Sequence, residues 1–181
     1  MTIFFTADTH WGHSNIIRYC DRPFETKIEH DEALISNWNR VVQPKDHVYH
    51  LGDVGFSNPL ILYKILQRLH GKIHLIKGNH DGPALRDPAL QRFTFVKDVH
   101  CLTTQYLRKK VKIFLSHYAH RTWPFANHGS IHLFGHSHGK MPPFGLSFDV
   151  GVDCWNFTPI SLETVMLEIE RLNVQSTQLV T

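Results

Sequence analysis

The sequence has few cysteines, no long apolar run and little net charge. Its three cysteines, Cys20, Cys101 and Cys154, are odd in number and form no C-x-x-C pair, which argues against a disulfide framework or a thiolate zinc site. No apolar stretch approaches the roughly 18 residues of a membrane span, and the first residues do not resemble a signal peptide. We therefore expect a cytoplasmic protein without a membrane partner.

The length and composition fit a single globular domain. The net charge is +3 with histidines neutral, which is too mild to favour extensive electrostatic binding of nucleic acid. A chain of 181 residues that is 42% hydrophobic can bury a substantial core, so we predict a single domain over residues 1–181. The unusual count is histidine, with 15 residues. Because imidazole is the commonest metal ligand, this excess favours a metal site.

Several runs of strand-forming residues stop at side chains suited to metal binding. Helices predicted over 27–42 and 59–69 separate the first three runs, which indicates parallel strands whose carboxyl ends meet at one sheet edge. Ligands bind at that edge in open α/β sheets. A β-rich region over 93–116 has a basic hairpin tip at 108–110, and Ser161 precedes a last helix. The polar residues at the strand ends are Asp8, His10, Asp53, Asn79, His117, His136 and His138.

These seven side chains are too many ligands for one ion and suit two. Mixed nitrogen and oxygen donors without thiolate fit divalent Mn, Fe, Co, Ni or Zn better than Mg or Ca, and Mn is our first choice. Asp53, in the middle of the set, can bridge both ions. Glycines at 52, 78 and 135 would let the backbone approach the ions closely. The site would carry about +2, since two divalent ions meet two carboxylates, so we expect a small phosphorylated substrate.

Further residues are assigned catalytic and substrate-binding roles. His80 follows the ligand Asn79 and is the candidate general acid, and Asp81 would hold its imidazole in orientation. Arginine suits a bidentate grip on phosphate. Tryptophans at 11, 38, 123 and 155 could stack a base, although Trp38 lies on a helix stripe typical of a core. Candidate substrate contacts are His13, Asn15, Arg18, Arg121 and His128, with Arg22 a further one.

The ordered series Asp8-x-His10, Gly52-Asp53, Gly78-Asn79-His80-Asp81, His117 and Gly135-His136-x-His138 resembles the signature of the calcineurin-like metallophosphoesterases. Within that superfamily, the segments Asp8–Asn15 and Asp149–Asn156 resemble small bacterial and phage phosphoesterases without a cap domain. The resemblance implies a four-layer α/β-β/α sandwich of two mixed sheets flanked by helices. It also implies that His80 protonates the leaving group. One ion would be held by Asp8, His10, Asp53 and His138, and the other by Asp53, Asn79, His117 and His136.

The hypothesis is therefore a dinuclear metal-dependent phosphoric ester hydrolase. It would act on phosphomonoesters or phosphodiesters, nucleotide-like ones among them, by attack of a metal-bound hydroxide. One alternative is a nuclease on DNA or RNA, which the modest net charge does not favour. Another is a protein-interaction scaffold that keeps the fold, although here the whole ligand set is present. The sequence leaves open the substrate, the metal loaded in the cell and the oligomeric state.

Overall fold

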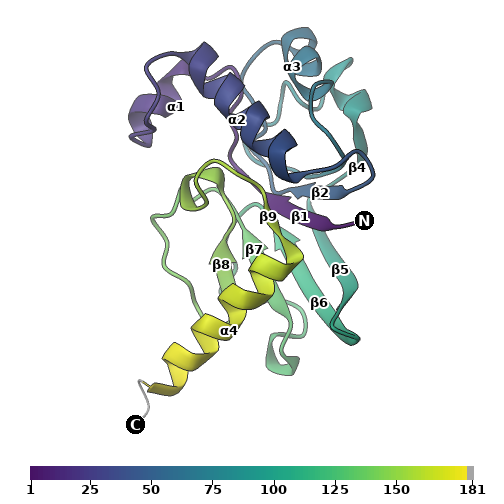
Figure 1. Ribbon diagram of the computed structural model, residues 1–181, viewed down its shortest axis with the longest axis vertical. Coiled ribbons are helices and arrows are strands. Elements are labelled where there is room, and N and C mark those ends of the chain that lie inside the picture. The colour runs from purple at the N-terminus through teal and green to yellow at the C-terminus, as the bar shows by residue number, and fades with distance from the viewer. Residues whose placement is uncertain (179–181) are drawn as a thin grey trace.

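The chain forms two mixed β-sheets with helices packed around them (Figure 1). The computed structural model describes residues 1–178. The first sheet has the strand order β4-β3-β2-β1-β9, in which β9 runs antiparallel to β1 and the other neighbours pair in parallel. Its strands are β1 (Ile3–Thr6), β2 (His47–His50), β3 (Lys72–Ile76), β4 (Phe93–Lys97) and β9 (Ile160–Ser161).

The helices between the first three strands begin at the residues that the sequence indicated. Helix α2 (Lys27–Val41) is capped by Thr26, whose hydroxyl accepts the N–H of Glu29 at 3.1 Å. Helix α3 (Pro59–Leu66) is capped by Asn58 and starts with proline, but it ends three residues before the predicted residue 69. The predicted parallel pairing of β1, β2 and β3 is confirmed.

The second sheet has the order β5-β6-β7-β8, with β5 antiparallel to β6 and the other pairs parallel. A hairpin turn at Leu107 and Arg108 joins its first two strands, close to the predicted tip. The preceding strand, β4, does not belong to this sheet, because it pairs with β3 in the first sheet. The strands are β5 (Val99–Tyr106), β6 (Lys109–Ser116), β7 (Ile131–Phe134) and β8 (Ser147–Asp149).

Two cores lie on opposite faces of the first sheet. One lies between the two sheets and includes Phe5, Leu115 and Leu133, together with Val165 and Ile169 of α4 (Leu162–Gln178). The other lies under α2 and α3 and is packed around Trp38, Val48 and Leu62. Alternation along each strand sends successive side chains to the two faces, so both faces of the first sheet are buried.

The outer face of the second sheet is covered by the long loop 117–130. The rings of His120 and Trp123 pack against His132 on β7, with centroids 5.5 and 5.2 Å apart. The two mixed sheets and their flanking helices confirm the predicted α/β class. On the outer face of the second sheet, the long loop takes the place of the flanking helices that were expected there. Short helical segments complete the chain: α1 (Ser14–Tyr19), η1 (Ala89–Arg92), η2 (Ala126–His128) and η3 (Val152–Cys154). Within residues 1–178, no helix combines the length and the apolarity that a membrane span requires.

Candidate metal centre

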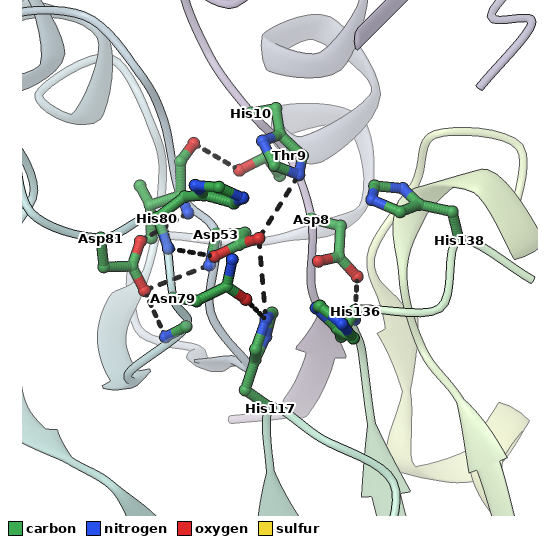
Figure 2. Close-up of polar contacts among 12 residues, drawn as sticks. Asp8, Thr9, His10, Asp53, Asn79, His80, Asp81, His117, His136 and His138 are labelled. Carbon is green, nitrogen blue, oxygen red and sulfur yellow. Dashed lines mark hydrogen bonds and ion pairs between the residues drawn. The ribbon is translucent and has the colours of Figure 1, made fainter. Parts of the chain in front are cut away.

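The strand ends bring the seven predicted ligands into one cluster between the two sheets (Figure 2). Asp53 lies in the middle, and its Oδ2 is 3.6 Å from Nε2 of both His10 and His117. The donor atoms of Asp8, His10 and His138 lie within 4.8 Å of one another. The donor atoms of a second group, Asp53, His117 and His136, do so as well.

Asn79 joins the second of these groups. Its Oδ1 lies 3.0 Å from Nε2 of His117 and accepts the Tyr118 hydroxyl at 3.1 Å. The other ring nitrogen of His117, Nδ1, is 2.7 Å from the carbonyl oxygen of Leu51. With Nδ1–H donated to this carbonyl, Nε2 is the ring nitrogen that faces Asn79 and Asp53, where it could coordinate an ion.

Several donor atoms of the cluster are buried with nothing to bond. Asp8 is fully buried and His10 is 3% exposed, yet Oδ1 of Asp8 and both ring nitrogens of His10 have no hydrogen-bond partner. An unsatisfied buried polar atom costs about 1–3 kcal/mol. Oδ1 of Asp8 and Nε2 of His10, the ring nitrogen that faces Asp53, are donors of the kind that a divalent transition metal ion coordinates, so the residues fit the ion that the donor set implies.

The backbone at the cluster adopts a conformation that L-residues usually avoid. Such left-handed conformations cost about 1–3 kcal/mol each and gather at functional sites, where the surrounding structure enforces them. Here the residues with this conformation lie in the loops that follow β1, β2 and β7, and their side chains turn into the cluster. The candidate ligands with positive φ are Asp8 (58°), His10 (51°), Asp53 (57°), His136 (67°) and His138 (48°).

Two glycines let the loops approach each other at Asp53. A Cβ added at Gly78 would lie 2.3 Å from Oδ1 and 2.5 Å from the backbone nitrogen of Asp53. At Gly52, where φ is +95°, it would lie 2.6 Å from the nitrogen of Gly78 and 2.6 Å from Nδ1 of His117. The close approach expected at these glycines is thus present, since any side chain would push the ligands apart.

The charges in the first group of donors are coupled. Burial raises the pKa of the Asp8 carboxyl well above its usual range. Burial, and then the nearby His138, lower the pKa of His10. At His138 burial lowers the pKa, but hydrogen bonds that the ring makes to Asp153 and Cys20, together with the charge of Asp8, outweigh it and raise the pKa to about 10. A divalent cation beside these carboxylates would supply the positive charge that a proton on His138 otherwise provides, so the two compete.

A buried arginine holds this side of the cluster in place. The guanidinium of Arg22, 4% exposed, forms two 2.8 Å hydrogen bonds to the carboxylate of Asp153. It also donates to the carbonyl oxygens of Asp8 at 2.8 Å and Thr9 at 3.2 Å. Asp153 in turn lies 2.7 Å from Nδ1 of His138. The N–H groups of Arg22 therefore bind internal partners, and its guanidinium is not available to bind a substrate phosphate.

The candidate acid His80 is exposed at the edge of the cluster. Its backbone N–H donates to Oδ1 of Asp53 at 2.9 Å, which ties it to the proposed bridging ligand. The structure gives Asp81 a different role from the predicted one of orienting the His80 ring. Its buried carboxylate accepts the backbone N–H groups of Gly78 (2.7 Å), Asp53 (3.1 Å) and Val54 (2.7 Å). Figure 2 shows these bonds, which join the two ligand-bearing loops.

The predicted substrate contacts are scattered. His13 lies beside the cluster, with its ring centroid 5.7 Å from that of His10, and Asn15 and Arg18 are exposed on the adjacent helix α1. His128 lies just before β7, at the opposite end of that strand from His136. Arg121 lines a separate cavity with His120, Phe134 and Met141. The fold thus brings His13 to the cluster and places Asn15 and Arg18 on the helix that follows it, whereas His128 and Arg121 lie elsewhere.

Aromatic rings do border the cluster, but they are not the tryptophans. Trp11 and Trp38 are 0% and 1% exposed and pack against each other in the core. The exposed rings at the cluster belong to Phe56, 4.7 Å from His80, and Tyr118, 4.6 Å from His136. Sequence reasoning missed both. The available signal was proximity, since Phe56 follows Asp53 by three positions and Tyr118 follows His117 directly.

The chain is similar to known proteins in both sequence and fold. The chain is 34% identical over 179 residues to the uncharacterized protein MJ1445 of Methanocaldococcus jannaschii, covering 97% of this chain and 95% of that protein. It is 26% identical to the Gene 66 protein of Mycobacterium phage L5, covering 83% of this chain and 86% of that protein. A crystal structure of AQ665, a protein of unknown function from Aquifex aeolicus, shares the fold with a TM-score of 0.65 at 23% identity, covering 94% and 98% of the two chains.

A family model extends over the part of the chain that carries all seven candidate ligands. The model describes the calcineurin-like phosphoesterase superfamily domain and matches residues 1–141. Within that span the strand ends converge on the two groups of histidine and aspartate donors, of which all but His136 and His138 are buried. The chain therefore belongs to the calcineurin-like phosphoesterase superfamily.

Proposed function

We propose that this protein is a dinuclear metal-dependent phosphoesterase that hydrolyses phosphomonoesters or phosphodiesters. The observation that carries the proposal is the pair of three-donor groups at the strand ends, each with its donor atoms within 4.8 Å. Membership of the phosphoesterase superfamily supports the reaction class. The orphaned atoms of Asp8 and His10 support metal binding, because they are buried and have no other partner.

The ligand assignment follows the two groups. Asp8, His10 and His138 would hold one ion, and His117, His136 and Asn79 the other, with Asp53 between them. Two such ions lower the pKa of a water to make a nucleophile and neutralise the oxygens of the phosphoryl group. The mixed nitrogen and oxygen donors favour Mn, with Fe, Ni, Co or Zn as alternatives.

The residues of the chain supply orientation and a proton. Arg22 and Asp153 hold the ring of His138, and Asp81 holds the loop that carries Asn79 and His80. His80 is exposed and fixed through its backbone to Asp53, so its imidazole can donate a proton to the departing alkoxide. That proton matters most when the leaving group is a poor one.

The proposal is tested by titrating metal-free protein with Mn, Fe, Co, Ni and Zn while following hydrolysis of chromogenic monoesters and diesters. Asp53→Asn should lose metal loading and turnover together, because the shared ligand is lost. His80→Ala should keep both ions by elemental analysis and slow the esters of weakly acidic alcohols most. If the wild-type protein hydrolyses none of the esters with any of the ions, the proposal is refuted and a scaffold role is favoured.

A further inference from the structure

An exposed strip of rings lies next to the candidate acid His80. Phe56, which is 40% exposed, follows the end of β2, and its backbone N–H donates to the carbonyl of Trp11 at 2.9 Å. This bond and the bridge between Trp11 and Gly55 hold the Phe56 loop against the loop that carries His10 and His13. The ring is therefore presented at the rim of the cluster by ordered backbone.

The rings of the strip lie in contact with one another. Phe56 stacks on His13 with centroids 4.2 Å apart and an interplanar angle of 21°. The Phe56 ring also lies 4.7 Å from the ring of His80 and 6.0 Å from that of His10. Tyr19, which is 57% exposed, meets the edge of His13 at 6.3 Å and continues the strip. A single exposed phenylalanine needs no explanation, but this one lies beside both a candidate ligand, His10, and the candidate acid, His80.

We infer that the strip of Phe56, His13 and Tyr19 binds a planar ring on the leaving group, so that the preferred substrates are phosphate esters of nucleosides. This inference rests on the proposed function, because it takes His80 as the acid that protonates the leaving alcohol and so fixes where that alcohol lies. The leaving oxygen must come within hydrogen-bond reach of His80, and the rest of the alcohol then lies over Phe56. A nucleobase offers a flat π-face that stacks on an aromatic side chain without any hydrogen-bond code.

The cleanest substrate pair differs only in the base. Adenosine monophosphate and ribose phosphate share the sugar and the phosphoryl group, and their methyl esters provide the same comparison for a diesterase. With Mn²⁺ bound, wild-type protein should show a kcat/KM about 10-fold higher for the nucleotide, which is the effect of one base–aromatic stack. Phe56→Ala should remove this preference through KM, and Phe56→Trp should retain it.

A binding measurement separates stacking from a general loss of activity. By calorimetry with Mn²⁺ present, Phe56→Ala should bind adenosine monophosphate about 10-fold more weakly and bind inorganic phosphate as the wild type does. Phe144→Ala, which removes another exposed phenylalanine on the loop before β8, is the matched control and should change neither affinity.

Equal kcat/KM for the two esters in the wild type would overturn the inference and leave the proposed function intact. An equal loss for both esters in Phe56→Ala would do the same. If no ester is hydrolysed with any ion, the proposed function fails instead. The calorimetric comparison of nucleotide and phosphate then still decides whether the strip binds a nucleobase.

Discussion

Replacing Arg22 with methionine should destabilise the fold by about 3–5 kcal/mol, the usual effect of removing one partner from a buried ion pair. The guanidinium is 4% exposed and is bound through two 2.8 Å contacts to Asp153. Without it, the Asp153 carboxylate, whose side chain is 9% exposed, keeps only His138 as a charged partner. Two backbone carbonyls, of Asp8 and Thr9, lose their donor as well.

The pairwise part of this effect is measured by a double-mutant cycle. Asp153→Asn keeps the shape but removes the charge, so in the double variant Arg22→Met/Asp153→Asn no carboxylate is stranded at this position. The double variant should therefore be more stable than the sum of the single effects predicts, by at least about 1 kcal/mol. Arg68→Met is the matched control, because the ion pair of Arg68 with Glu32 is half exposed and should contribute under about 1 kcal/mol.

Urea unfolding of the metal-free proteins gives these free energies. Additive effects within about 0.5 kcal/mol, or a cost of Arg22→Met no larger than that of Arg68→Met, would refute the reasoning. A second measurement concerns the metal itself. Asp153→Asn should weaken metal binding about 10- to 100-fold, because Asp153 lies 2.7 Å from Nδ1 of His138 and orients that ring.

Three further predictions concern the loops and the core. Gly78→Ala should abolish metal loading, measured by elemental analysis, because the new Cβ would meet the Asp53 backbone nitrogen at 2.5 Å, whereas Gly82→Ala has open space and should load normally. Burial lowers the pKa of His132 to about 4 from 6.5, so the unfolded chain takes up the proton first as pH falls. His132 alone should therefore lower the stability below about pH 6.5, by roughly 2 kcal/mol at pH 5, and His132→Gln should remove this part of the decline in urea titrations. Asn58→Ala removes the cap of α3 and should cost about 1 kcal/mol in the same assay, with an unchanged m-value.

The sequence by itself predicted the seven candidate ligands that the fold brings together and the three parallel strands that carry four of them. Each candidate ligand directly follows an apolar strand run, and helical caps at Thr26 and Asn58 separate the first three runs. These signals are local, because strand period, capping and glycine placement are written in neighbouring residues. Parallel pairing then brings the carboxyl ends of β1, β2 and β3 to one edge, as the structure shows.

Only the tertiary structure decided what the neighbouring polar and aromatic side chains contact. Asp81 looked like the partner of His80, but across 28 and 27 positions its carboxylate accepts the amides of Asp53 and Val54. Arg22 finds Asp153 across 131 positions. Phe56 is held beside His80 by a bridge between two loops. Such contacts depend on how distant loops pack against each other, and no local period or spacing in the chain encodes that packing.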